Sequence, residues 1–451
     1  MTSTTLTPTA PVAEKPAKGR WITDWDPEDA AFWASTGRRV ARRNLIFSIF
    51  AEHLGFAIWT LWSVVVVALP PASFPFILDV DKKFWLVAIP NLIGALMRLP
   101  YTLAVPRFGG RNWTVVSALL LLIPIGLASY CVTRPGTPYW FFLLTAATAG
   151  FGGGNFASSM TNIAFFFPER RKGTALGLNA AGGNLGLSVM QFVVPMIIFF
   201  GFSLIYTTAV WVPLILAAAV CAYLFMNNLH VSRSSVREQL AAVRRPHAWI
   251  MSFLYIGTFG SFLGLSAAFP AVLQFEFPKD QKMHVLGTAL LLPVAFTGPL
   301  VGSIARPIGG WLSDRIGGAR VTAVVFALMG VGTYCAILAA HAKSLSGFMA
   351  SMLALFTLAG AGNGSTYKMI PAIFYKKDGG SVQARRESAA TLGMAGAIGA
   401  LGGFYMPRAI GNSIKATGGI DTAFTIFIVM YAACLLVTWY CYLRRGGLRG
   451  V

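Results

Sequence analysis

The chain has 451 residues, of which 56% are hydrophobic and only 12% charged, and its mean hydropathy is +0.65. This composition excludes an ordinary soluble domain and indicates a polytopic membrane protein. A net charge of +20 is also compatible with nucleic-acid binding, so the distribution of the basic residues along the chain has to decide between the two.

The segment 1–43 precedes the first apolar run and is predicted to be a cytoplasmic tail. Its first part is rich in Thr, Pro and Ala and lacks an apolar core, which is typical of disorder and differs from a cleavable signal peptide. Asp26 and Pro27 then form a helix-entry signal, and the basic stretch that follows predicts a short surface helix leading into the membrane.

Apolar runs of about 20 residues, the length that crosses a bilayer as an α-helix, follow along the chain. We place twelve helices at 45–70, 84–105, 114–132, 139–167, 174–200, 204–227, 248–275, 285–312, 321–341, 347–374, 388–411 and 421–443. The polar central loop 228–247 separates an N-terminal half, 44–227, from a C-terminal half, 248–443, and a short tail, 444–451, ends the chain. The sequence therefore predicts an all-α membrane protein with two six-helix halves.

Lysine and arginine are divided unequally between alternate connections. The connections on one side, including both tails and the central loop, hold 25 of them, and those on the other side hold seven. By the positive-inside rule the richer side faces the cytoplasm, so both termini and the central loop are predicted there. The basicity thus reports topology, and we expect no nucleic-acid partner.

Arg98 and Arg306 are isolated cations inside long apolar runs. They are 208 residues apart, and each lies eight residues before a turn rich in Arg and Gly. A cation in the bilayer is costly unless it faces a polar cavity or a partner, and a guanidinium offers planar oxyanions a fork of donors. Two arginines at matched positions therefore predict one central anion site.

Other features also recur in both halves. The turn after Arg306, GGWLSDRIGGAR, is predicted to be a cytoplasmic gate turn formed by Gly310, Asp314, Arg315 and Gly317. PRFGGRN, after Arg98, is a degraded copy with Pro106 in place of Asp314, and AGFGGGNFASSM (149–160) and AGAGNGSTYKMI (359–370) share three glycines in register. This spacing predicts parallel repeats with a substrate site between the halves.

Glycine clusters are the second recurring feature of these helices. Small residues let membrane helices approach closely and slide, although ordinary packing accounts for most such glycines. The glycines that we expect to serve packing and hinge motion are Gly150, Gly152, Gly153, Gly154, Gly182, Gly183, Gly360, Gly362 and Gly364.

Titratable groups are rare within the apolar runs. Of sixteen acidic residues only Glu52, beside His53, lies clearly inside one. This scarcity of buried carboxylates disfavours a cationic substrate. Both side chains can carry a proton for coupling; the alternative is a structural role in which Glu52 pairs with a nearby cation or with His53. Lys368 either contributes to coupling or snorkels to the cytoplasmic side, and Arg408 is expected to snorkel at the other interface.

No chemistry of another kind competes with this interpretation. The five cysteines have no paired spacing, the five histidines form no cluster, and no GxxxxGK[ST] loop occurs. We therefore expect no metal, no cofactor, no enzymatic activity and no ATP-driven pumping.

The quoted motifs carry a family resemblance. GGWLSDRIGGAR resembles the loop motif of the major facilitator superfamily, and GFGGGNFASSMTNIAFFFPERRKGTALGLNAAGGNLG and AGAGNGSTYKMIPAIF resemble the nitrate signatures of the nitrate/nitrite porter family, in particular its NarK group. The likeness extends through nearly all twelve helices. It implies a bacterial inner-membrane transporter for nitrate and nitrite with a rocker-switch cycle.

The resemblance also implies which residues bind the anion: Arg98, Arg306, Asn184, Tyr255, Phe156 and Phe259. The arginines would clamp one planar anion from both halves, the amide and hydroxyl would donate hydrogen bonds, and the two phenylalanine rings would sandwich it. Without the resemblance, the three aromatic residues would be taken for ordinary core residues.

Coupling is left open between two mechanisms. Two arginines without an anion repel each other in a closing cavity, which favours nitrate/nitrite antiport, whereas titration of Glu52 would permit nitrate/proton symport. Lys368 stands where some members of the group carry a neutral Gln. A channel, a membrane sensor and a carrier for another small anion are the remaining alternatives, and saturation with counterflow distinguishes a carrier. We expect a monomer in the lipid bilayer.

Overall fold

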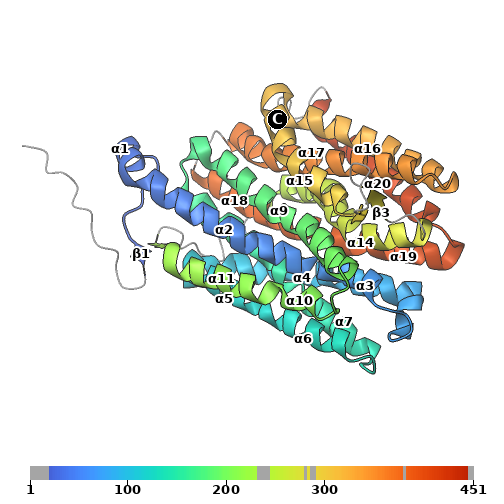
Figure 1. Cartoon of the computed structure of the whole chain (residues 1–451). Coiled ribbons are helices and arrows are strands. Elements are labelled where there is room, and N and C mark those ends of the chain that lie inside the picture. Colours follow the sequence, from blue (N-terminus) through green and yellow to red (C-terminus); the bar gives the residue numbers. More distant parts are fainter. Residues whose placement is uncertain (1–19, 231–243, 279–281, 285–290, 379–381, 445–451) are drawn as a thin grey trace, which may run out of the picture.

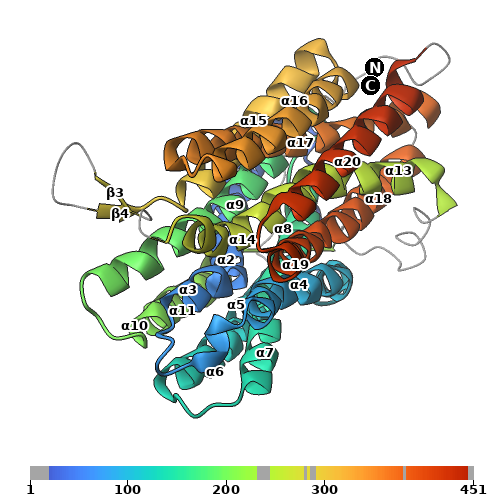
Figure 2. The same ribbon diagram turned by 90° about the vertical axis from the view of Figure 1, so that its right-hand side faces the viewer.

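The computed structural model describes residues 20–230, 244–278, 282–284, 291–378 and 382–444. These residues form twelve helical rods, as predicted. In both views the N-terminal half, coloured blue to green, lies against the C-terminal half, coloured yellow to red (Figure 1, Figure 2). The predicted all-α fold with two halves is confirmed, apart from two short two-stranded sheets.

Six rods make up the N-terminal half. The first consists of α1 (Ala30–Phe32), η1 (Trp33–Gly37), α2 (Arg38–Trp59) and α3 (Leu61–Ala68), and η2 (Pro75–Leu78) follows it. The others are α4 (Val80–Phe108), α5 (Gly110–Leu120) with α6 (Leu122–Thr133), α7 (Tyr139–Thr148) with α8 (Phe151–Phe166), α9 (Glu169–Phe199), and α10 (Tyr206–Ala209) with α11 (Trp211–Phe225).

Six rods also make up the C-terminal half. They are α13 (Pro246–Tyr255) with η5 (Ile256–Gly260) and α14 (Ser261–Glu276), α15 (Thr297–Ile316), α16 (Gly318–His341), α17 (Leu345–Asp378), α18 (Val382–Ala400) with α19 (Gly402–Thr417), and α20 (Asp421–Thr438) with η6 (Trp439–Leu443).

The surface and the interior fit a lipid environment. Among the described residues, nine helical segments are long and apolar enough to cross a membrane. Large apolar side chains such as Val331 and Val429 are exposed on the outer faces of α16 and α20, where lipid chains can cover them. The largest fully buried side chains include Trp59, Trp62 and Trp211, which fill the space between rods.

The eighth rod begins later than predicted. Lys282–His284 (β3) and Leu291–Pro293 (β4) pair as an antiparallel hairpin, and α15 starts only at Thr297. A short apolar run does not by itself distinguish a strand from a helix, which explains the error at 291–296. Residues 285–290 lie outside the described part of the chain. Pro299 lies in the first turn of α15, where its missing N–H leaves no hydrogen bond unmade.

The predicted surface helix is continuous with the first membrane rod. α1, η1 and α2 follow one another from Ala30, and the Asp29 carboxylate caps the start by accepting from the N–H groups of Ala31 and Phe32 at 2.8 and 3.2 Å. Before this helix, Trp21–Ile22 (β1) pairs in parallel with Asn228–Leu229 (β2), the start of the central loop. Residues 1–19 and 231–243, where disorder and most of the loop were predicted, lie outside the described residues.

The two predicted basic turns share one backbone geometry. α4 ends at Gly109, with φ 85° and ψ 146°, and α15 ends at Gly317, with φ 93° and ψ 134°. A positive φ of this kind is accessible to glycine but strained for other residues. The two glycines are 208 residues apart, as are Arg98 and Arg306. In each half, therefore, a turn of the same geometry follows a buried arginine at the same spacing.

Candidate functional site

Arg98 of α4 and Arg306 of α15 meet at the interface between the halves. Their exposed fractions are 1% and 3%, and their charges interact electrostatically. The guanidinium carbon of Arg98 lies 4.6 Å from the ring centroid of Phe156 and 4.9 Å from that of Phe259. The corresponding distances for Arg306 are 5.5 and 6.0 Å. One arginine from each half thus flanks the same pair of rings.

The two rings also come from different halves. Phe156 lies on α8 and Phe259 on η5, and their centroids are 5.8 Å apart with an angle of 26° between the ring planes. A planar anion stacked against both faces would need about 7 Å, because each contact requires about 3.5 Å. In this structure the rings therefore stack on each other, and the predicted sandwich requires the halves to move apart.

The hydrogen bonds of the arginines leave several donors unused. Arg98 Nη1 donates to the backbone oxygen of Gly396 on α18 at 2.6 Å, and Arg306 Nη2 donates to the Tyr255 hydroxyl at 3.4 Å. Nε and Nη2 of Arg98 and Nη1 of Arg306 have no partner among the described atoms. Buried cationic donors without partners are costly, so this arrangement favours the binding of an anion.

Further aromatic rings complete the surroundings of the arginines. The Tyr255 ring stacks on Phe259 with centroids 5.1 Å apart, and Tyr367 of α17 lies 5.6 Å from the Arg306 guanidinium carbon. Trp59 lies 5.6 Å from that of Arg98. Tyr367 and Trp59 were not among the binding residues predicted from the sequence. Tyr367 directly precedes Lys368 in the second glycine motif, which is the one signal that could have found it.

Asn184 is buried but separate from this hydrogen-bonded group. Its exposed fraction is 1%, and neither atom of its amide has a hydrogen-bond partner in the part of the chain that the structure describes. Asn155 and Asn363 share this property. Buried amides without partners are uncommon, so these residues mark a polar interior. The structure brings together the other five predicted binding residues.

Glu52 is held by neutral donors. Its Oε2 accepts from the Ser159 hydroxyl and from the Asn179 amide, both at 2.5 Å, while Oε1 has no described partner. His53 instead shares a hydrogen bond with the Gly182 oxygen at 3.0 Å. The pairing of Glu52 with His53 or with a cation, considered as the structural alternative, is not found among the described residues. Glu52 nevertheless interacts electrostatically with both arginines.

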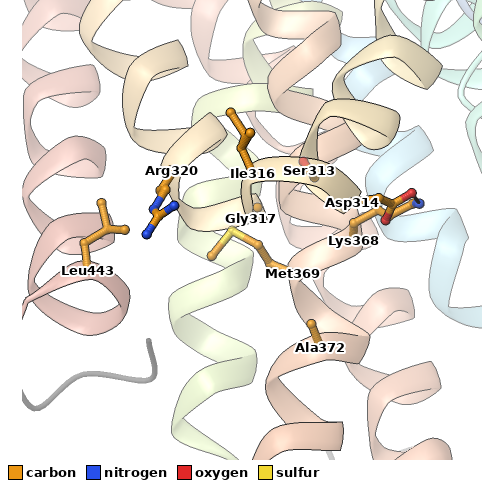
Figure 3. A pocket seen from close by; sticks show the side chains of 10 residues that line it. Ser313, Asp314, Ile316, Gly317, Arg320, Lys368, Met369, Ala372 and Leu443 are labelled. Atoms are coloured by element: carbon orange, nitrogen blue, oxygen red, sulfur yellow. Dashed lines mark hydrogen bonds and ion pairs between the residues drawn. The ribbon is translucent and has the colours of Figure 1, made fainter. Parts of the chain in front are cut away.

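Lys368 lies at the predicted gate turn and not among the residues around the arginines. Its ammonium group forms an ion pair with Asp314, at the edge of a cavity of about 370 Å³ (Figure 3). A Cβ atom on Gly310 would lie 3.7 Å from the Lys368 side chain. The guanidinium carbon of Arg315 lies 4.0 Å from the centroid of the Trp311 ring. Lys368 therefore connects α17 to the last turn of α15. Of the predicted gate turn, Gly310, Asp314 and Arg315 lie within α15, and only Gly317 follows the helix.

The predicted packing glycines lie at close helix contacts. A Cβ on Gly153 would come within 2.7 Å of Gly94 Cα, one on Gly154 within 2.7 Å of the Tyr101 ring, and one on Gly360 would overlap the backbone of Gly302. A side chain would also collide with neighbouring atoms at Gly150, Gly152, Gly182, Gly183, Gly362 and Gly364. These contacts support the packing role, and Gly364 abuts the backbone oxygen of Arg306 itself.

Arg408 has a charged partner in the other half of the protein. Its Nη2 lies 2.7 Å from an Asp81 carboxylate oxygen of α4, and its guanidinium carbon lies 4.2 Å from the Trp85 ring. Lys415 reaches the second Asp81 oxygen at 3.6 Å. That Arg408 snorkels to the interface stays a prediction, and the structure adds a carboxylate partner that the sequence did not indicate. These contacts join the halves at the end of the rods opposite to Gly109 and Gly317, and we call them the cross-half clamp.

Metal coordination has no structural support within the described ranges, where no three His, Cys, Asp or Glu side chains gather as ligands. The site is instead a pair of buried guanidinium groups ringed by aromatic side chains.

The chain is similar to several known proteins. Residues 53–407 match the family model of the Major Facilitator Superfamily. The chain is 42% identical to the nitrate/nitrite transporter NarU of Salmonella typhimurium, over 94% of this chain and 96% of that protein. It is 38% identical to the probable nitrate/nitrite antiporter NarK2 of Thermus thermophilus, over 96% and 98%.

Two more distant proteins extend the comparison. The nitrite extrusion protein of Bacillus subtilis is 28% identical over 90% of this chain and 96% of that protein. The crystal structure of the nucleoside transporter NupG superposes with a TM-score of 0.60 at 12% identity, covering 88% of this chain and 99% of that one. The latter likeness concerns the fold alone.

Proposed function

The chain belongs to the major facilitator superfamily and, within it, to the nitrate/nitrite transporters, and on this premise we propose that it carries nitrate and nitrite across the membrane by alternating access. It is a multi-pass membrane protein of a transporter family. It acts on the anions by binding and releasing them and not, as an enzyme would, by converting them.

One observation carries the proposal. Arg98 and Arg306, from opposite halves, are both buried beside Phe156 and Phe259, and three of their nitrogen atoms lack partners among the described atoms. A small oxyanion can accept from both guanidinium forks at once. We assign Arg98, Arg306, Tyr255, Phe156, Phe259 and Asn184 to this site.

Exchange of nitrate for nitrite follows from the two charges. When the halves close around the site, two guanidinium groups without an anion repel each other in a medium of low dielectric constant. An anion on the site removes this barrier, so the protein changes conformation with cargo bound in both directions. The Thermus relative, which is named a probable antiporter, supports this mode.

The orientation in the membrane is part of the proposal. The end of the rods with Gly109 and Gly317 carries the richer set of Lys and Arg residues, so we assign it to the cytoplasm together with both termini. The membrane is then a bacterial inner membrane, and 44–227 and 248–443 are the two moving halves. Because the arginines of one chain complete the site, a monomer suffices for transport.

Replacement of either arginine by lysine tests the proposal. Lysine keeps the charge but loses the planar fork, so we expect Arg98→Lys and Arg306→Lys each to raise the Kd for nitrate at least about tenfold. Isothermal titration of the purified protein measures this, and Arg134→Lys, at an exposed arginine over the Tyr130 ring, is the matched control. Near-normal nitrate binding by either lysine variant would contradict the proposal that both arginines hold the anion.

Proton-coupled uptake is the second candidate, favoured by Glu52. This carboxyl group is 1% exposed, its Oε1 has no described partner, and it interacts electrostatically with both arginines. A buried carboxyl group without an ion pair can take up and release a proton as the site fills and empties. Nitrate would then enter together with a proton.

A further inference from the structure

The two arginines of the site have different neighbours. Arg98 is surrounded by Trp59, Phe156 and Phe259, whose rings offer no hydroxyl group. Arg306 is surrounded additionally by Tyr255, which accepts its hydrogen bond at 3.4 Å, and by Tyr367, whose ring centroid lies 5.6 Å from the guanidinium carbon. The neutral hydroxyl groups near the two arginines therefore belong to Tyr255 and Tyr367, and both also interact electrostatically with Arg98.

Tyr367 faces the other half of the protein. It lies on α17 of the C-terminal half, yet it interacts electrostatically with Glu52 and Arg98 of the N-terminal half as well as with Arg306. Its ring is 6.1 Å from that of Tyr255 at an angle of 42°. Tyr255 is fully buried, whereas Tyr367 keeps accessible surface. Unlike Tyr255, Tyr367 is therefore not completely enclosed by protein atoms.

The position of Tyr367 is fixed by packing on both sides of it. The neighbouring Thr366 hydroxyl shares a hydrogen bond with the Thr258 hydroxyl at 3.1 Å, which joins α17 to η5. On the other side of the helix Gly364 abuts the backbone oxygen of Arg306. These contacts fix the backbone of α17 next to Tyr367, so less conformational entropy is lost when the side chain binds a ligand.

Nitrate and nitrite differ in the number of acceptors that they offer. Nitrate has three oxygens in a plane and nitrite has two. Nitrate therefore has three edges of paired oxygens and nitrite has one. A nitrate held by two guanidinium forks on two edges still presents a third edge, whose oxygens can each accept a further hydrogen bond, and nitrite has no such edge. A site built to donate a hydrogen bond discriminates against an analogue that lacks the acceptor, because its donor is then left unpaired.

We propose that Tyr367 determines specificity in this site, its hydroxyl donating to the oxygen that distinguishes nitrate from nitrite. This inference rests on the proposed function, since it concerns the same site and the same two anions. Tyr367 acts without adding charge, so it shifts the preference between the anions and leaves the shared attraction of the arginines in place.

The variant Tyr367→Phe removes only the hydroxyl group and tests the proposal. Isothermal titration of the full-length purified protein gives the Kd for nitrate and for nitrite at one pH and one ionic strength. We expect the Kd for nitrate to rise about tenfold, the size of one hydrogen bond to a charged group, and the Kd for nitrite to change less than about twofold. Tyr375→Phe is the matched control, because Tyr375 lies on the same helix and is 69% exposed.

Two results would overturn the role of Tyr367. An equal weakening for both anions, with a lowered melting temperature, would make the hydroxyl merely structural; an unchanged ratio of the two Kd values would remove it from recognition. The proposed function fails separately: if the wild-type protein binds neither anion, the transport assignment is wrong whatever the variant does.

Discussion

At the scale of single residues, the site depends on two buried charges that form no ion pair with a described carboxylate. Arg98 and Arg306 keep Nε, Nη2 and Nη1 donors that no described atom accepts from, while aromatic rings cover their faces. Rings stabilise a guanidinium through its faces and leave its edge free. The edge is where a planar oxyanion accepts two parallel hydrogen bonds, so the rings hold the arginines without competing for the substrate.

Glu52 gives a prediction at this scale. In Glu52→Gln, the amide oxygen can still accept from Ser159 and Asn179, which hold the carboxyl group at 2.5 Å in the wild type. We therefore expect nitrate/nitrite exchange in proteoliposomes to stay within about twofold of the wild-type rate, because these hydrogen bonds hold the side chain in place.

The same variant decides the role of the proton. Uptake by the wild type that follows an inward proton gradient and disappears in Glu52→Gln would assign proton transfer to this residue and contradict obligatory exchange. The control is Glu169→Gln, at an exposed residue of α9 paired with Lys172.

Sequence patterns were sufficient for some site residues and insufficient for others. The isolation of Arg98 and Arg306 in apolar runs marked them, because a lone membrane cation needs a reason. Phe156 and Phe259 came only from the family resemblance, since one ring among 34 phenylalanines has no distinguishing pattern. The ion pair of Arg408 was not predicted, because its partner, Asp81, lies more than three hundred residues away in sequence and no local pattern reveals such a pair.

At the scale of helices, glycines set how closely the rods approach. α15 and α17 touch through Gly302 and Gly360, and the same pair of helices carries Arg306 and Tyr367. A methyl group at this contact would force the backbones apart, because membrane helices pack through small residues. Helix spacing and site geometry are therefore set by the same contact.

Alanine substitutions at two glycines test this packing. Gly360→Ala should destabilise the protein by about 1–3 kcal/mol, as overpacking does, and should lower both the melting temperature and the transport rate. Gly330→Ala on α16 is the control: a Cβ there meets nothing within 4 Å, so alanine should be neutral or slightly stabilising. Equal melting temperatures for the two variants would contradict the assigned role of Gly360.

The presence of each helix was easier to predict from the sequence than the residues at which the helix begins and ends. Twelve apolar runs gave the twelve rods, because a span needs a minimum apolar length whatever its neighbours are. The start of α15 at Thr297 was missed, since the preceding apolar residues pair as β4 with a strand that only the folded chain supplies. Likewise α1 to α3 extend from Ala30 to Ala68, because polar helix turns can continue beyond the bilayer.

At the scale of the whole molecule, contacts between the halves include a central level and a far level, in addition to hydrogen bonds such as that from Gln191 to the Ser266 backbone oxygen. The central level holds the hydrogen bond from Arg98 to Gly396 and the stacked Phe156 and Phe259 rings. The cross-half clamp of Asp81, Arg408 and Lys415 holds the far end, where Lys83 also donates to Gln274 at 2.8 Å. Alternating access requires these far contacts to break when that end opens.

Removal of the clamp carboxylate should make that end open more often. In Asp81→Asn the two cationic partners lose their counter-ion, so we expect amide hydrogen exchange in α19 to become roughly fivefold faster, as for the loss of about 1 kcal/mol. Asp79→Asn is the control, because Asp79 caps the same helix and, among the described residues, its ion pair is with Lys82 of its own half. Unchanged exchange in Asp81→Asn would mean that the clamp does not limit opening.

Counterflow in proteoliposomes tests the central claim, that nitrate and nitrite exchange on one site shared by the two halves. Nitrate uptake is compared between vesicles loaded with nitrite and empty vesicles, each with and without an inward proton gradient. The account predicts saturable uptake that requires internal nitrite and ignores the gradient, because two unpaired guanidinium groups oppose the return of the empty carrier. Uptake of equal rate into empty vesicles would contradict it, and dependence of that uptake on the gradient would establish proton symport instead.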